Sequence, residues 1–160
     1  MTDHHLAQLN VGRLLHPLHA PGSAGFVAGL EPVNALADTA PGFVWRLTDE
    51  DGKDATSIHP NGDDMIVNLS VWESREALWN FAYRSDHLEF VRRRREWFVR
   101  TAEPIAVLWW VEAGHVPSVE EALGRLDLLR EEGPGPEAFT FREPYDPAGL
   151  AGAVTTNAGR

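Results

Sequence analysis

The chain has 160 residues, 43% of them hydrophobic and 24% charged, which is the composition of a folded domain rather than of a disordered segment. Its formal net charge of −10 argues against a nucleic-acid partner, because contacts to phosphates need an excess of Lys and Arg. Since the sequence contains no cysteine, disulfides, thiolate metal ligands and cysteine nucleophiles are excluded.

The first half of the chain predicts the order strand, helix, strand, strand. In the first strand, Gln8 and Asn10 alternate with apolar residues and therefore lie on one face of the sheet. The helix is expected over residues 23–40, with Ser23 as its N-cap and Pro32 as a bend or break. The strands expected in this half are 6–13, 43–48 and 65–72.

The second half predicts a long helical region and a shorter helix. The helical region begins at Ser74 and runs to about Arg100, with a break near Ser85, which would cap a second segment. Ser118 and Glu121 form a capping box that opens the shorter helix, which ends at residue 132. The other elements expected are a strand at 105–112, a short edge strand at 139–141 and a flexible tail at 143–160.

This order of elements is the β-α-β-β-α-β plan of a ferredoxin-like α+β domain, here with an extra C-terminal helix. In that plan two helices cover one face of a four-stranded antiparallel sheet, and the other face stays open. We therefore expect one domain over residues 5–142. The longest apolar stretch, residues 105–111, is too short to cross a bilayer, which takes roughly 20 residues, so we expect a cytoplasmic protein with no membrane partner.

The face expected to be open carries neutral polar groups and indoles. A solvated face would favour Lys, Glu and Thr, so this pattern is typical of a binding surface or an interface. We expect two sheets to stack face to face in a homodimer that encloses a cavity. The residues on this face are Gln8, Asn10, Asn68, Ser70 and Trp72, together with either Trp45 or Arg46 and either Trp109 or Trp110.

Two neighbouring stripes follow the helical region 74–100. Phe81, Leu88, Val91 and Phe98 form an ordinary core stripe, which is enough to dock a helix on a sheet. The second stripe interleaves aromatic side chains with an imidazole and a guanidinium, and its spacing of three and four residues places it on one helix face. It predicts the wall of a polar-tipped pocket and consists of Tyr83, His87, Phe90, Arg94 and Trp97.

Each candidate has a chemical and a structural interpretation. His87 is a candidate general acid or base, an axial haem ligand, or a hydrogen-bonded structural histidine. Arg94 is a candidate for holding a carboxylate or an enolate, and the tryptophans either stack on a planar ligand or belong to the core. The expected catalytic residues are His87 and Arg94, and the expected substrate-binding residues are Asn10, Trp45, Arg46, Asn68, Ser70, Trp72, Tyr83, Phe90, Trp97 and Trp110; no metal site is expected.

Several long motifs resemble a bacterial family known only as a domain of unknown function. The motifs are Ala7-Gln-Leu-Asn-Val-Gly-Arg13, Pro41-Gly-Phe-Val-Trp-Arg46, Val67-Asn-Leu-Ser-Val-Trp-Glu73, Tyr83-Arg-Ser-Asp-His87 and Leu108-Trp-Trp-Val111. The resemblance extends over nearly all of residues 5–142. The family is similar to a branch of the dimeric α/β-barrel superfamily, whose relatives include antibiotic biosynthesis monooxygenases, stress-responsive barrel proteins and haem-binding barrels.

Together with the pocket residues, the resemblance implies a small-molecule enzyme of the antibiotic-biosynthesis-monooxygenase type. It would carry out a cofactor-independent oxidation, or a rearrangement or cyclisation, of a planar aromatic or polyketide-like substrate. Arg94 and the asparagines would hold the substrate anion, and His87 would handle the proton. One alternative is a haem-binding barrel with His87 as the axial ligand; another is a non-catalytic ligand-binding or stress-related dimer. The expected partners are a small hydrophobic or aromatic substrate and a second copy of the chain.

Overall fold

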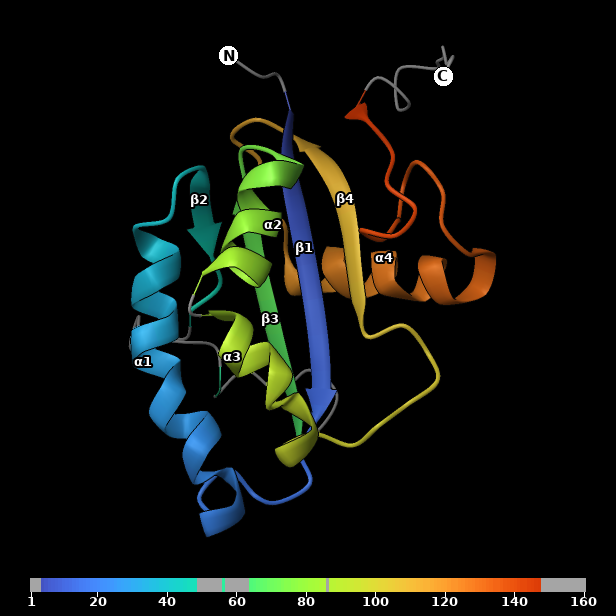
Figure 1. Cartoon of the computed structure of the whole chain (residues 1–160). Helices are drawn as coiled ribbons and strands as arrows, with labels where there is room; N and C mark the ends of the chain where they lie inside the picture. The colour runs from blue at the N-terminus through green and yellow to red at the C-terminus, as the bar shows by residue number, and fades with distance from the viewer. Residues whose placement is uncertain (1–3, 49–55, 57–63, 86, 148–160) are drawn as a thin grey trace.

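The computed structural model describes residues 4–48, 56, 64–85 and 87–147, without the side chain of Phe90. Figure 1 shows a single sheet with helices on both sides of it. Within the described ranges, no helix combines the length and the apolar character needed to cross a membrane. The elements are β1 (His4–Arg13), α1 (Ala24–Asp38), β2 (Phe43–Arg46), β3 (Met65–Trp72), α2 (Arg75–Arg84), α3 (His87–Arg92), β4 (Ala106–Glu112) and α4 (Val119–Glu132), with 3-10 turns η1 (Pro21–Ser23) and η2 (Arg94–Glu96).

The four strands form an antiparallel sheet in the order β2-β3-β1-β4. This is the ferredoxin-like α+β arrangement, so the predicted fold class is confirmed. The central pairing of β1 with β3 places Gln8 opposite Ser70 and Asn10 opposite Asn68. Because side chains alternate along a strand, these four polar residues share one face of the sheet.

Helices cover both faces of this sheet. Figure 1 shows α2 and α3 in front of the strands and α4 behind them. The face that carries Gln8 and Ser70 packs against α1, α2 and α3, through contacts such as Trp72 with Leu78 and Ala37. The prediction that the polar face would be open is therefore wrong: it faces the helices, and no second sheet can stack on it directly. The homodimer itself stays a prediction.

The opposite face of the sheet forms a closed apolar core under α4. Leu9, Leu69 and Trp109 are at most 2% exposed there, and they pack in one cluster with Leu126 and Leu129 of α4. The alternation that turns Leu9 toward α4 turns its neighbours Gln8 and Asn10 the other way. An extra C-terminal helix thus covers the side of the sheet that the two-helix plan leaves exposed.

Glu121 joins α4 to this core. Its carboxylate accepts hydrogen bonds from Trp109 Nε1 at 3.0 Å and from His115 Nε2 at 2.8 Å. Burial alone would raise the pKa of Glu121, but the hydrogen bonds from His115 and Trp109 outweigh it and lower the pKa. The predicted cap is confirmed, because Ser118 Oγ accepts from the backbone N–H of Glu121 at 3.0 Å.

The long helical region is broken more often than its pattern predicts. Ser85 has an extended backbone, and its hydroxyl donates to Phe81 O and accepts from the N–H of His87, so the break predicted at this residue is confirmed. The predicted continuation to Arg100 is wrong: α3 ends at Arg92 and is followed by the 3-10 turn η2. A change to i→i+3 bonding rotates every later side chain about the helix axis. The predicted stripe from Tyr83 to Trp97 therefore does not lie on one straight helix.

The chain after α4 returns to the outer edge of β4. The expected strand at 139–141 is reduced to a single bridge, in which Phe139 pairs with Leu108. Further along, the backbone carbonyl of Tyr145 accepts a 2.7 Å hydrogen bond from Trp110 Nε1. Phe139 is fully buried, so this return segment is part of the packed structure.

Candidate active site

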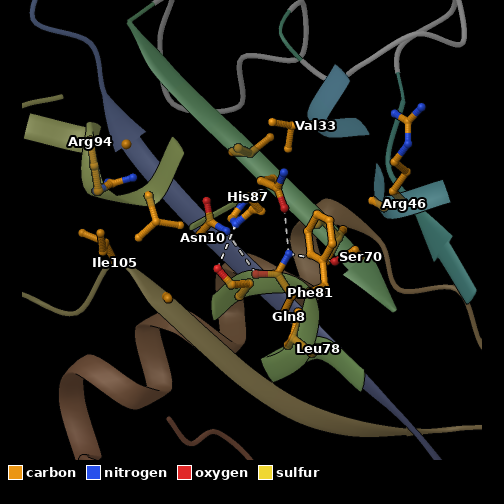
Figure 2. Close-up of a pocket in the computed structure, with 18 of the residues that line it drawn as sticks. Gln8, Asn10, Val33, Arg46, Ser70, Leu78, Phe81, His87, Arg94 and Ile105 are labelled. Carbon is orange, nitrogen blue, oxygen red and sulfur yellow. Dashed lines mark hydrogen bonds between the residues drawn. The ribbon is translucent and has the colours of Figure 1, made fainter. Parts of the chain in front are cut away.

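A cavity of about 550 Å³ lies between the sheet and α1, α2 and α3. Figure 2 shows lining side chains from β1 and β3 as well as from the helices, with Arg94 and Arg46 at opposite ends of the view and His87 and Asn10 between them. Its walls are mainly apolar and aromatic, and polar side chains line it from the strands as well as from the helices. This combination is typical of a small-molecule site.

The strands supply a hydrogen-bonded group of four side chains, Gln8, Asn10, Asn68 and Ser70, which we call the polar floor. Gln8 Nε2 donates to Asn68 Oδ1 at 2.7 Å and to Ser70 Oγ at 2.9 Å. Asn10 Nδ2 donates to Gln8 Oε1 at 3.1 Å. All four residues line the cavity, and Figure 2 labels Gln8, Asn10 and Ser70. Gln8 and Ser70 are buried, whereas Asn10 is half-buried and Asn68 is exposed, so the cavity gives the unused polar atoms of this group somewhere to bond.

His87 is the first residue of α3 and faces the same cavity. The break at Ser85 places the imidazole near the end of α2, where Nδ1 lies 3.3 Å from the carbonyl oxygen of Ala82. Its ring centroid is 4.7 Å from that of Phe81. Burial lowers the pKa of His87 below its ordinary value of 6.5, although the hydrogen bond to Ala82 acts in the opposite direction. The imidazole is therefore neutral at pH 7.

Arg94, in η2, brings a cation to the cavity. Its guanidinium donates to the carbonyl of Val11 at 3.0 Å and lies 4.7 Å from the centre of the Phe98 ring. Burial lowers its pKa, but an arginine with a depressed pKa still carries its charge at neutral pH. The hydrogen bond to β1 fixes this charge at one end of the cavity.

Aromatic rings form much of the wall. Trp72 is 1% exposed and stacks on Phe81 with a centroid distance of 5.1 Å and an interplanar angle of 27°. Trp97 is 2% exposed, and its ring centroid lies 5.7 Å from that of Phe26 of α1. Tyr83 is exposed and lies close to Phe141, so these two rings stand where the cavity meets the surface.

The structure brings most of the sequence candidates together. The cavity-lining ones are Asn10, Arg46, Asn68, Ser70, Trp72, Tyr83, His87, Arg94 and Trp97. Trp45 pairs with Val71 and packs in the core under α4, and Trp110 packs with Phe139, so neither lines the cavity. Phe90 belongs to α3, but its side chain lies outside the described part of the structure.

Arg46 lines the cavity but is already engaged. Its guanidinium donates to both carboxylate oxygens of Asp38 at the end of α1, at 2.8 Å and 3.3 Å. The ion pair ties β2 to α1 at the edge of the cavity. Of Trp45 and Arg46, it is therefore Arg46 that lies on the cavity face of the sheet.

Three kinds of lining residue were missed as site candidates. Phe81 and Val91 come from the stripe interpreted as ordinary core, and both line the cavity because the break at Ser85 separates their two helices. Gln8 was placed on the right face but was not selected, although it is the centre of the polar floor. Phe26, Leu30 and Val33 of α1 also contribute, and their pattern does not differ from that of an ordinary amphipathic helix.

The described residues do not fit haem well. A porphyrin presents broad apolar faces, whereas this cavity has the amides of the polar floor along the strands. We therefore derive no step through haem. Among the described residues, there is also no cluster of His, Asp and Glu that would hold a metal ion.

The arrangement can support proton abstraction. A neutral imidazole lies on the helical wall, hydrogen-bond donors lie on the strands, and a cation lies at one end. These are the groups needed to remove a proton from a substrate and to stabilise the resulting anion.

Solved structures with a similar course of the chain all have low sequence identity. SnoaB, a cofactor-independent oxygenase from Streptomyces nogalater, is 17% identical over 70% of this chain and 95% of its own, with a TM-score of 0.42. Rv0793 from Mycobacterium tuberculosis is 15% identical over 71% and 99%, with a TM-score of 0.45. A dabb family protein with a ferredoxin-like fold from Mesorhizobium loti is 16% identical over 72% and 98%, with a TM-score of 0.42.

No curated protein matches the chain. A family model does match, over residues 5–154, and its description is "Domain of unknown function (DUF3291)". The match covers both the strands and the helices that enclose the cavity. The chain therefore belongs to the DUF3291 family.

Proposed function

We propose that the protein is a small-molecule enzyme whose reaction begins when His87 removes a proton from a planar aromatic or polyketide-like substrate. The observation that carries this proposal is a half-buried imidazole with a lowered pKa on the wall of a cavity of about 550 Å³ whose strand side is polar. A cavity meant only to hold an apolar molecule would need neither group.

The environment of His87 suits a general base. Since the carbonyl of Ala82 can only accept a hydrogen bond, Nδ1 carries the proton in the neutral ring and the lone pair is on Nε2. A pKa below 6.5 keeps the imidazole in its neutral, basic form at physiological pH. General base catalysis of this kind accelerates a reaction by about 100-fold to 10,000-fold.

The rest of the cavity suits a planar anion. Trp72, Phe81 and Phe98 offer flat apolar surface to a fused or aromatic ring system. Arg94 supplies a fixed positive charge that stabilises negative charge formed on the substrate. The polar floor supplies hydrogen bonds to the substrate oxygens.

The anion can then react in two ways. In an oxidation, a methylene group of the substrate loses two hydrogens and gains one oxygen atom of dioxygen as a ketone, and the second oxygen atom leaves as water. In a cyclisation, the same carbanion attacks a carbonyl carbon within the substrate, and the new alkoxide takes up the proton held by His87. Both use the same first step, which needs no cofactor.

Oxygen uptake with anthrone, a planar tricyclic ketone with an acidic methylene group, tests the oxidative route. We expect the wild-type protein to consume dioxygen and form the quinone, and His87→Gln to do so about 100-fold to 10,000-fold more slowly. The matched control is His115→Gln, which changes an exposed histidine on α4's side of the sheet. Equal uptake by wild type and His87→Gln would refute the role of His87.

Two further outcomes would favour the alternatives. A Soret band in the protein purified from haem-replete cells would favour haem binding. Tight binding of anthrone-like ligands with neither oxidation nor cyclisation would favour a non-catalytic binding protein.

A further inference from the structure

Ser70 lies at the centre of an unusual hydrogen-bond arrangement in the cavity. Its side-chain oxygen accepts one hydrogen bond from Gln8 Nε2 at 2.9 Å and another from Trp72 Nε1 at 2.8 Å. All three residues are at most 7% exposed. A serine hydroxyl has two lone pairs and one proton, so these two donors occupy its whole accepting capacity.

The direction of both hydrogen bonds is fixed by the surrounding residues. The indole N–H of Trp72 can only donate. The amide of Gln8 is held with its nitrogen toward β3, because its oxygen accepts from Asn10 Nδ2 at 3.1 Å and its second N–H donates to Asn68 Oδ1 at 2.7 Å. Both N–H groups of the Gln8 side chain therefore donate, and its oxygen accepts from Asn10.

The hydroxyl proton of Ser70 has no acceptor in this arrangement. The two accepted hydrogen bonds and the Cβ occupy three tetrahedral directions around the oxygen, and the O–H bond takes the fourth. Ser70 makes no hydrogen bond as a donor within the described part of the chain, and its side chain lines the cavity. A buried donor of this kind is costly unless it finds an acceptor.

We propose that Ser70 is an obligate hydrogen-bond donor to the phenolate or enolate oxygen of the ligand, with Gln8 and Trp72 as positioning residues that force this role on it. This inference rests on the proposed function, since that oxygen is where the charge gathers once the proton is removed. It adds a specificity: an aromatic amine at the same place is rejected, because its N–H would meet an oxygen whose lone pairs are already used.

The probe is para-nitrophenol, whose phenolate absorbs visible light, and the bound pKa is read from absorbance against pH without dioxygen. A hydrogen bond to a charged acceptor contributes enough to lower the bound phenol's pKa by about one unit relative to the free phenol. We expect that shift in the wild type and in Ser70→Thr, which keeps the hydroxyl. We expect its loss in Ser70→Ala. The amine para-nitroaniline should bind wild type at least about tenfold more weakly than para-nitrophenol does.

Thr140→Val is the matched control, because it removes a different cavity-lining hydroxyl that does not touch the polar floor. It should leave the shift unchanged. An equal shift in wild type and Ser70→Ala, a raised pKa on binding, or no binding of para-nitrophenol to wild type would each overturn the proposal. Because no turnover is measured, a failure of oxygen uptake would leave this result standing, and the two claims can fail separately.

Discussion

The two faces of the sheet are both covered by helices, yet only one of them is filled. Under α4, the side chains of β1, β3 and β4 are apolar and almost fully buried, and Trp109 is held to Glu121 by a hydrogen bond. Under α1, α2 and α3, strands β1 and β3 present the polar floor, and a cavity of about 550 Å³ remains. The difference lies in alternate residues of the same strands, such as Leu9 and Gln8.

This contrast indicates that the face under α4 contributes mainly to stability, whereas the face under α1, α2 and α3 carries the groups available for chemistry. Amides cannot be packed against helices without hydrogen-bond partners, and here they bond to one another and border the cavity between the helices and the sheet. Ser85 also helps to shape the cavity, because the break at this residue separates α2 from α3 above the polar floor. The polar residues thus mark a covered cavity rather than an exposed surface.

The largest expected difference between the faces is in the cost of truncation. Leu126→Ala, on the α4 side, removes a side chain that is 2% exposed and should lower the free energy of unfolding by about 2 to 5 kcal/mol. Asn68→Ala, on the cavity side, should cost less than about 1.5 kcal/mol. Urea unfolding of both variants measures the comparison, and equal losses would contradict it.

The same contrast predicts that a change at the centre of the polar floor affects ligand binding more than stability. Gln8→Leu keeps a similar volume but removes every hydrogen bond of that amide, whose partners face the cavity and can bond to water. Unfolding should change by less than about 1.5 kcal/mol, whereas binding of para-nitrophenol should weaken at least tenfold. Calorimetric titration with para-nitrophenol measures the change in affinity. A variant that lost stability but kept its affinity would show that the floor serves packing.

The lowered pKa of His87 predicts a pH-dependent stability. Because the unfolded chain binds the proton more readily than the folded one, stability falls as the pH drops below 6.5 toward the folded pKa. The slope from this residue is at most about 1.4 kcal/mol per pH unit. His87→Gln should lack this contribution, so its unfolding free energy should change less between pH 7.5 and pH 5 than that of wild type. An identical pH dependence would contradict the burial of a neutral imidazole.

The smallest expected effect concerns the cap of the covering helix α4. Ser118→Ala removes the hydrogen bond to the N–H of Glu121 and should cost about 1 kcal/mol, as N-caps generally do. The cavity lies on the other side of the sheet, so ligand affinity should stay the same. A loss of affinity in this variant would mean that the two faces are coupled.

The sequence predicted the positions of the strands well, but it did not predict which face of the sheet each helix covers. Residues 65–72 were predicted to the residue as β3, because strict alternation leaves little freedom. The same alternation indicates that Gln8, Asn10 and Ser70 share a face of the sheet. It does not indicate which face α1, α2 and α3 cover. The expectation of an open polar face followed from the two-helix plan, which does not include the covering position of α4.

For the candidate cavity, the sequence predicted which residues lie together better than it predicted the course of the helix that carries them. His87, Arg94 and Trp97 do line one cavity, as the stripe predicts, although the helix carrying them is interrupted. Neither Gly nor Pro marks the end of α3 at Arg92, so the pattern could not reveal it. The choice between Trp45 and Arg46 depended on a strand register that only the paired neighbours determine.

The most direct test of the central claim is hydrogen exchange at the acidic carbon of a ketone in heavy water, followed by NMR without dioxygen. It measures proton abstraction alone, whatever the later fate of the anion, and alpha-tetralone and anthrone are suitable probes. The account predicts exchange at least about 100-fold faster with wild type than with His87→Gln, and unchanged exchange with His115→Gln. Equal exchange by wild type and His87→Gln would contradict the assignment of His87 as the base of this cavity.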